Sequence, residues 1–128
     1  MNWTAANTNT HQDHVIAHVV GATPLGHFIW DETAYILLDI GFVWNIYLDM
    51  EMGLVPQALA VAELNELRDF VDQADDTRTG PIETVELFEN GDERRLVLNC
   101  ESRKLLVETS LKHRWTRIES APIDKLTS

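Results

Sequence analysis

The segment AYILLDIGFVWNIYLDM, residues 34–50, alternates with a period of two. Every even position carries an apolar side chain, whereas the odd positions mix aromatic, aliphatic and polar residues. Successive side chains of a β-strand point to opposite faces, so this parity predicts strand structure with the even side chains in the core. We expect the core to be anchored by Ile36, Leu38, Phe42, Trp44 and Ile46.

The same segment is too long to form one straight strand. Its seventeen residues would extend roughly 56 Å, whereas a domain of this size is roughly 36 Å across. Gly41 is the natural place to turn, because glycine adopts positive φ easily. A hairpin with the three-residue loop 39–41 keeps the parity, and so does a single strand bent at a bulge; we favour the hairpin. The hairpin pairs Leu38 with Phe42, Ile36 with Trp44 and Ala34 with Ile46.

Further alternation and turn signals predict strands elsewhere in the chain. The Asn90-Gly91 pair is typical of a two-residue hairpin turn, and the implied register pairs Val85 with Leu96 and Glu86 with Arg95. With the two halves of residues 34–50, we expect about seven antiparallel strands in two groups, the others being 14–22, 27–30, 82–89, 93–100 and 104–115.

One long central helix is expected between the two groups, over about residues 56–74. Pro56 suits the first helical position. Apolar residues then recur at helical spacing: Ala60, Leu64, Leu67, Val71 and Ala74. The other face of this helix and the residues after it are acidic: Glu66, Asp69, Asp72, Asp75 and Asp76. Acids near a helix C-terminus oppose the helix dipole, which suggests that they serve another purpose, such as docking a basic partner.

Length and composition predict one α+β domain over residues 1–128, with a flexible arm at 1–12 and a tail at 122–128. The one cysteine, Cys100, excludes an intrachain disulfide and suits a reducing compartment. No apolar run is long enough to span a membrane, and residues 1–13 lack the apolar segment of a signal peptide. We therefore expect a cytoplasmic protein.

The net charge of −11 is concentrated in the first part of the chain. Residues 1–80 hold 12 acids against 2 bases, a net of −10, and residues 81–128 hold 9 acids against 8 bases, a net of −1. An acidic surface repels phosphate backbones, so nucleic-acid binding is not expected. Solubility is the simpler explanation of this charge, and an acidic face that meets a basic partner is the alternative.

The polar odd positions of residues 34–50 are the candidate ligand site. Tyr35, Asn45, Tyr47 and Asp49 share one face of the predicted strands, and this mixture fits a pocket, a subunit interface or a solvated sheet face. His27 or Asp39 would serve as acid or base if the site were catalytic. For Asp39 we prefer a structural interpretation, in which its carboxylate binds backbone amides at the turn.

Three histidines near the N-terminus, His11, His14 and His18, raise the question of a metal site. On a helix His14 and His18 would lie on one face, but on the strand expected here they lie roughly 13 Å apart, too far for one ion. We therefore expect no metal and no cofactor. No catalytic motif is present in the sequence, and nothing marks Cys100 as a nucleophile.

The leading hypothesis is a small acidic, non-catalytic binding or interaction protein that acts as a homo-oligomer, with a basic protein as a further partner. The alternative is a small-molecule-binding protein or modest enzyme that uses the odd face of residues 35–49. The discriminating observation is whether those side chains converge on one enclosed cavity.

Overall fold

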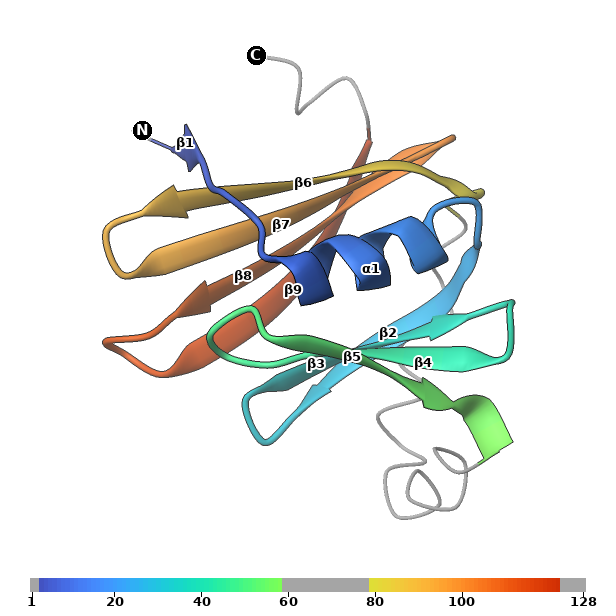
Figure 1. Ribbon diagram of the computed structural model, residues 1–128, viewed down its shortest axis with the longest axis horizontal. Helices are drawn as coiled ribbons and strands as arrows, with labels where there is room; N and C mark the ends of the chain where they lie inside the picture. The colour runs from blue at the N-terminus through green and yellow to red at the C-terminus, as the bar shows by residue number, and fades with distance from the viewer. Residues whose placement is uncertain (1–2, 59–78, 123–128) are drawn as a thin grey trace.

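Two antiparallel sheets pack face to face in the computed structural model, which describes residues 3–58 and 79–122 (Figure 1). The five-stranded sheet has the order β1-β6-β7-β8-β9, formed by Thr4–Ala5, Ile82–Asn90, Glu93–Cys100, Arg103–Ser110 and Trp115–Pro122. The four-stranded sheet has the order β2-β3-β4-β5, formed by Pro24–Trp30, Thr33–Leu38, Phe42–Ile46 and Met52–Pro56. Helix α1, Thr10–Val19, lies between the two sheets along one side.

The expected α+β class with one long central helix is wrong. Strands make up 58% of the described residues, and only one helix there, the short α1, has seven or more residues. Pro56 ends strand β5, and the described chain turns helical only at residues 57–58, directly after it. Because β5 is an edge strand of its sheet, one side of its backbone is unpaired and tolerates a residue without an N–H. Most of the span predicted as helix, residues 59–74, lies outside the described residues.

The expected first strand, residues 14–22, is also wrong, because most of it lies in α1. Asn9 caps this helix: its side-chain oxygen accepts a hydrogen bond from the Gln12 amide, and the Gln12 side chain accepts one from the Asn9 amide. Val15 and Val19, four residues apart, face the core. The β-branched composition of this segment is a weaker determinant than its cap and its apolar spacing.

The hairpin predicted for residues 34–50 is confirmed. Strands β3 and β4 pair Ala34 with Ile46 and Ile36 with Trp44, and Gly41 adopts a φ of 82° in the turn between them. The even-numbered residues Ile36, Leu38, Trp44 and Ile46 are fully buried, as expected. Phe42 is only partly buried, and its ring meets His18 edge to face with centroids 5.4 Å apart.

The hairpin of β6 and β7 forms near the predicted place but with a register two residues away. Val85 pairs with Leu98, not with Leu96, and the turn residues are Gly91 and Asp92. Of these two only Gly91 has positive φ, at 61°, which suits the first central position of a type II′ turn. A shift of two leaves every side chain on its predicted face, so the core prediction survives the error.

The single strand expected over residues 104–115 is instead the hairpin of β8 and β9. The chain turns at residues 111–114, where Arg114 has a φ of 55°, and β9 then continues to Pro122. At the other end of the chain, residues 1–12 were expected to form a flexible arm. In the structure this segment contains strand β1 and the start of helix α1.

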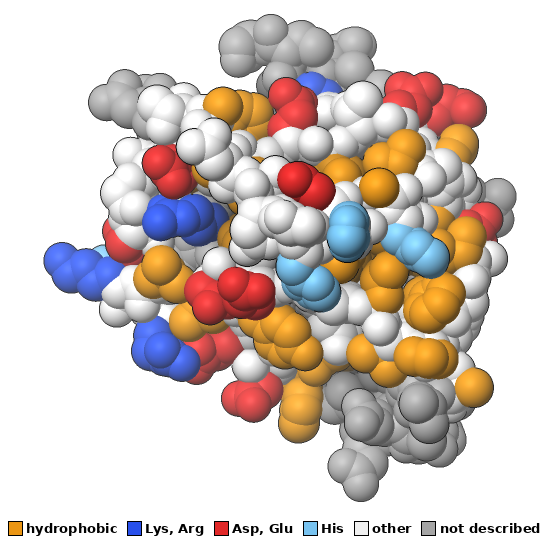
Figure 2. Space-filling view, in the orientation of Figure 1, with side chains coloured by type: hydrophobic (Ala, Val, Ile, Leu, Met, Phe, Trp, Pro, Cys, Tyr) orange, Lys and Arg blue, Asp and Glu red, His pale blue; other side chains and the backbone are white. Residues whose placement is uncertain are grey.

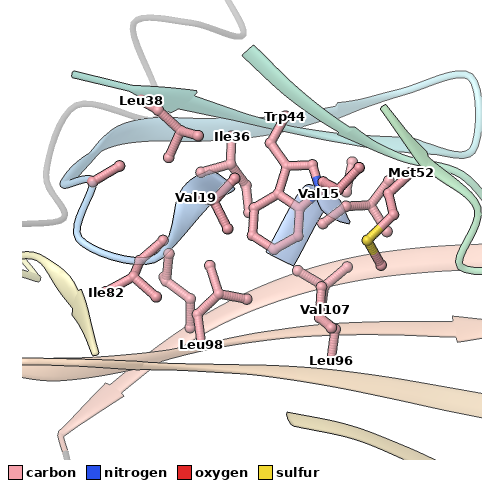
Figure 3. Close-up of a cluster of buried hydrophobic side chains, with 14 of the residues drawn as sticks. Val15, Val19, Ile36, Leu38, Trp44, Met52, Ile82, Leu96, Leu98 and Val107 are labelled. Atoms are coloured by element: carbon pink, nitrogen blue, oxygen red, sulfur yellow. The ribbon is translucent and has the colours of Figure 1, made fainter. Parts of the chain in front are cut away.

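The core fills the space between the two sheets and α1 (Figure 3). Trp44 and Ile36 extend from the four-stranded sheet, Leu98 and Val107 from the five-stranded sheet, and Val19 from the helix. The inner sheet faces are therefore committed to packing. A binding site must use the outer faces or the hairpin turns.

Candidate functional site

Three hairpin turns meet at one end of the sandwich and border an open hollow of about 370 Å³. They are the turn between β2 and β3, the turn between β4 and β5, and the turn between β8 and β9, all at the left of Figure 1. Two of these turns belong to the four-stranded sheet and one to the five-stranded sheet. We call this feature the hairpin-tip hollow; its lining includes Asp31, Glu32, Tyr47, Asp49, Leu111 and Arg114.

The backbone of these turns is unusual. Across residues 3–58 and 79–122, the non-glycine residues with positive φ are Asp31 at 51°, Glu32 at 65°, Met50 at 65° and Arg114 at 55°. All four lie in the three turns around the hollow. The left-handed conformation costs about 1–2 kcal/mol for a residue with a Cβ. Such strained residues cluster at functional sites more often than elsewhere.

Polar contacts between the two sheets hold the hollow in shape. Arg114 Nη2 lies 2.8 Å from Glu32 Oε2, and the hydroxyl of Thr116 donates a hydrogen bond of 2.9 Å to the Glu32 carbonyl. The ion pair is exposed, so it contributes at most about 1 kcal/mol to stability. Its main effect is to fix the turn of one sheet against the turn of the other.

The hairpin-tip hollow combines exposed apolar side chains with carboxylates. Of its lining residues, Tyr47 is 44% exposed and Leu111 is 37% exposed. Asp31, Glu32 and Asp49 supply three carboxylates. Arg114 is the only cation among the described lining residues and is already paired with Glu32. The surface is therefore acidic, with one exposed tyrosine and one exposed leucine.

The candidate residues Tyr35, Asn45, Tyr47 and Asp49 separate into two places. Tyr47 and Asp49 line the hairpin-tip hollow, and Asp49 Oδ1 accepts a hydrogen bond from the Glu51 amide. Tyr35 and Asn45 pair with each other across the outer face of the four-stranded sheet. There Tyr35 stacks on Phe28 with ring centroids 4.7 Å apart, and Asn45 is buried with its Oδ1 unpartnered.

The two candidate acid–base residues lie elsewhere. His27 pairs with Ile36, a core residue, and so shares the inner side of the sheet. Burial lowers the pKa of His27. Asp39 sits beside the β3–β4 turn, where its Oδ1 accepts a hydrogen bond of 2.9 Å from the Thr23 amide. Within the part of the chain that the structure describes, the six candidates do not converge on one cavity. The candidate acidic face, Glu66, Asp69, Asp72, Asp75 and Asp76, lies outside that part.

The helical position of His14 and His18 removes the objection that they lie too far apart to share an ion. Histidine side chains gather beside apolar ones on the surface around α1 (Figure 2). His11 Nε2, however, lies 2.7 Å from the Met52 carbonyl, and His18 packs against Phe42. The described residues contain no group of three metal-ligating side chains.

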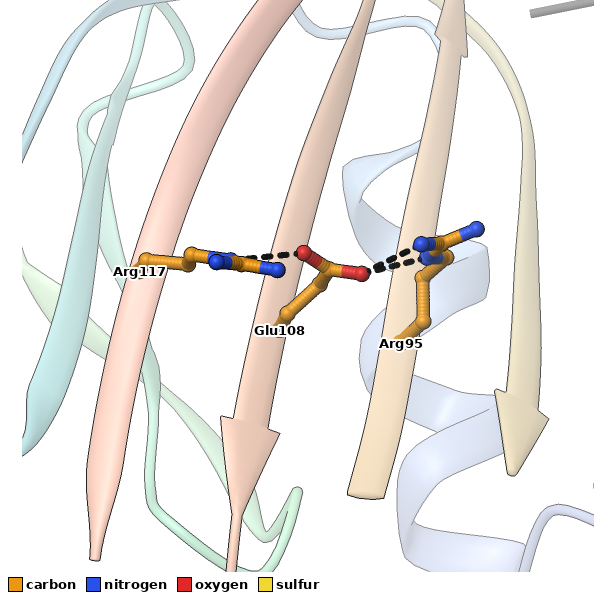
Figure 4. Close-up of polar contacts among 3 residues, drawn as sticks. All are labelled: Arg95, Glu108 and Arg117. Carbon is orange, nitrogen blue, oxygen red and sulfur yellow. Dashed lines mark hydrogen bonds and ion pairs between the residues drawn. The ribbon is translucent and has the colours of Figure 1, made fainter. Parts of the chain in front are cut away.

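A row of charged side chains that sequence reasoning missed crosses the outer face of the five-stranded sheet (Figure 4). Glu108, 4% exposed, lies between Arg95 and Arg117, with Arg95 Nη2 at 2.5 Å and Arg117 Nε at 2.8 Å from its carboxylate oxygens. The two guanidinium groups also stack on the indoles of Trp3 and Trp115, at 4.3 Å and 4.9 Å from the ring centroids. We call these five residues the arginine–glutamate row.

A sequence signal for this covered face existed. Residues two apart in a strand share one face, and the residues two positions before and after Val97 and Leu106 are all polar. Val97 and Leu106 are nevertheless apolar, and in the structure they are only 7% and 6% exposed. Apolar residues on the nominally polar face of a strand indicate that something packs there.

Comparison of the chain with protein-family models, with curated proteins and with solved structures gave no match. The fold and the candidate site therefore define the class by themselves: an antiparallel two-sheet β protein with an acidic hollow at its hairpin turns. Within the described ranges, no helix has the length and apolar character needed to cross a bilayer.

Proposed function

We propose that the protein is a non-catalytic interaction protein whose hairpin-tip hollow docks a basic, partly apolar segment of a partner protein. The observation that carries this proposal is the presence of two exposed apolar side chains, Tyr47 and Leu111, beside three carboxylates in a hollow of about 370 Å³.

The chemistry of the hollow matches an arginine- or lysine-containing segment. Tyrosine, here Tyr47, is a frequent anchor of protein interfaces and also attracts cations over its ring face. Asp31 and Asp49 have no cationic partner among the described residues, so each is available to a basic side chain. The net charge of −11 would speed the approach of a basic partner at low salt.

The separation of the candidate acid–base residues supports binding over catalysis. His27 shares the inner side of its sheet, and Asp39 is engaged at the β3–β4 turn, away from the hairpin-tip hollow. A general acid or base must reach the reacting group within hydrogen-bond distance or through one water. Neither residue is among those that line the hollow.

Homo-oligomerisation through sheet edges is not part of the proposal. Pro24, Pro56 and Pro122 lie in the edge strands β2, β5 and β9, and β1, the fourth edge strand, has only two residues. Proline and short length both disfavour pairing between edges of different copies.

For the compartment we retain the cytoplasm, because Cys100 is free and buried and needs no oxidising environment.

The proposal is tested by titrating the full chain with an unstructured peptide of alternating arginine and leucine residues, using calorimetry. We expect saturable binding that the double substitution Asp31→Asn with Asp49→Asn weakens at least tenfold. Glu83→Gln removes one exposed acid from β6 and serves as the matched control, with unchanged affinity. Equal affinity of the double variant and the control, or equal binding of a peptide with glutamate in place of arginine, would exclude this docking site.

A further inference from the structure

A second hollow, of about 200 Å³, opens on the outer face of the five-stranded sheet beside the arginine–glutamate row. Its apolar walls are the side chains of Trp3, Phe88, Val97 and Leu106. Three charged residues complete the lining: Glu86, Arg95 and Lys104. We call it the outer-face pocket. It shares no lining residue with the hairpin-tip hollow.

Two cationic side chains that line this pocket have donor groups without acceptors among the described residues. The Lys104 ammonium forms no ion pair or hydrogen bond with any residue in the described ranges. Arg95 uses Nε and Nη2 on Glu108, which leaves Nη1 free. A ligand that supplies acceptor atoms here would meet both cations, and hydrogen bonds to charged groups contribute more than neutral ones.

The remaining features restrict the ligand. A cavity of about 150 Å³ accommodates benzene, so the pocket has room for one aromatic ring. Val97 and Leu106 offer an apolar floor, and the Trp3 indole offers a ring face for stacking. The Glu86 carboxylate, which accepts a hydrogen bond of 2.8 Å from Asn99 Nδ2, disfavours a ligand that carries more than one negative charge.

We propose that the outer-face pocket binds a small aromatic monocarboxylate. The ring lies on Val97 and Leu106 beside Trp3, and the carboxylate accepts hydrogen bonds from Lys104 and from the free Nη1 of Arg95. Charge-assisted hydrogen bonds of this kind are roughly twice as strong as neutral ones, so the carboxylate provides the specificity. This site is independent of the proposed docking function.

Phenylacetate is a suitable probe, and phenylacetamide is its uncharged counterpart of nearly the same shape. We expect calorimetry and saturation-transfer NMR on the full chain to detect phenylacetate binding, with phenylacetamide at least tenfold weaker. Lys104→Met should weaken phenylacetate binding at least tenfold, whereas Lys104→Arg, which keeps the charge, should retain most of the affinity.

Lys112→Met, in the exposed β8–β9 turn, removes the same charge elsewhere and should leave phenylacetate binding unchanged. Trp3→Phe keeps a ring face for stacking but makes it smaller, and a loss of a few fold is expected. The melting temperature of each variant reports whether it is folded. Absence of phenylacetate binding, equal binding of phenylacetamide, or wild-type affinity in a folded Lys104→Met variant would each overturn the proposal.

Discussion

Asp92 links two hairpin turns of the five-stranded sheet through its carboxylate. Its Oδ2 accepts a hydrogen bond of 2.7 Å from the Ser110 hydroxyl and one of 3.1 Å from the Lys112 amide. The Ser110 hydroxyl first, and then the Lys112 amide, hold the pKa of Asp92 below its ordinary value of 3.8. A carboxyl group with a lowered pKa in the folded state stabilises the protein fully above the ordinary value. This stabilisation is lost as the pH falls through the lowered pKa.

Asp92→Asn should therefore lower the melting temperature at pH 7 and flatten its decline in acid. The wild type loses the Asp92 contribution as the pH falls below about 3.8, so the melting curves of the two proteins should approach each other there. Circular dichroism melts across the acid range measure this directly. Parallel curves for the two proteins at every pH would contradict the assignment.

Glu108 balances two guanidinium groups, so its neutralisation should destabilise the fold. We expect Glu108→Gln to lower the free energy of unfolding by about 2 kcal/mol. This is below the usual 3–5 kcal/mol for breaking a buried pair, because the Arg95 side chain is 27% exposed and that of Arg117 is 59% exposed. Denaturant unfolding gives the value.

A matched variant separates charge from packing in this row. The triple variant Arg95→Met, Glu108→Leu and Arg117→Met removes all three charges and keeps much of the side-chain volume. It should therefore recover most of the free energy of unfolding that Glu108→Gln loses. If the triple variant is as unstable as Glu108→Gln, loss of packing rather than an uncompensated charge is the cause.

At the level of elements, the β2–β3 turn has one central residue, Glu32, that a tight hairpin turn disfavours. Trp30 pairs with Thr33, and both residues between them, Asp31 and Glu32, have positive φ. Asn-Gly is the preferred sequence for such a turn. Glu32→Gly should therefore raise the free energy of unfolding by about 0.5–1 kcal/mol, after the loss of the exposed Arg114 ion pair is subtracted.

The same Glu32→Gly change should weaken binding of the arginine–leucine peptide, because it removes a carboxylate from the hollow.

Gly41→Ala calibrates the cost of backbone strain, because it adds a Cβ at a position with positive φ instead of removing one. Gly41 has a φ of 82° and open space around its Cα, so alanine there should lose about 1 kcal/mol through backbone strain alone. A Glu32→Gly protein that is less stable than the wild type would contradict the strain argument.

The sequence was sufficient to predict which face of a strand each side chain occupies. It was not sufficient to predict which residues form each turn. The alternation from Ala34 to Met50 defined the core face, because inward side chains must share parity, but it fitted a bent strand as well as the hairpin that the structure shows. The same logic placed Leu96 and Leu98 on the core face although the β6–β7 register was two residues off. Local composition failed at α1, where β-branched residues suggested a strand while the cap of Asn9 and packing produced a helix.

At the scale of the whole molecule, the two sheets and α1 share one core, so a cavity in it should destabilise the entire fold. Leu98 is fully buried between the sheets, and Leu25 is 49% exposed in β2. We expect Leu98→Ala to lower the free energy of unfolding by about 3 kcal/mol, and Leu25→Ala by less than about 0.5 kcal/mol. Similar losses for the two variants would show that the inner face is not the main core.

The candidate site could be predicted only in part, because it is assembled from turns that are distant in sequence. Tyr47 and Asp49 were identified from the odd face of one segment, and both line the hairpin-tip hollow. Leu111 and Arg114 join them only because the β8–β9 turn of the other sheet packs alongside. Parity within one segment contains no information about which turns of two sheets become neighbours.

The central claim is that the hairpin-tip hollow is the docking surface for a basic, partly apolar segment. It is tested most directly by mapping amide chemical shifts of the ¹⁵N-labelled protein during titration with the arginine–leucine peptide. The account predicts that the largest shifts cluster at residues 31–33, 47–49 and 111–114, with little change on α1 or on the outer face of the five-stranded sheet. Saturable shifts confined to other surfaces, or no shifts at peptide concentrations well above that of the protein, would contradict it.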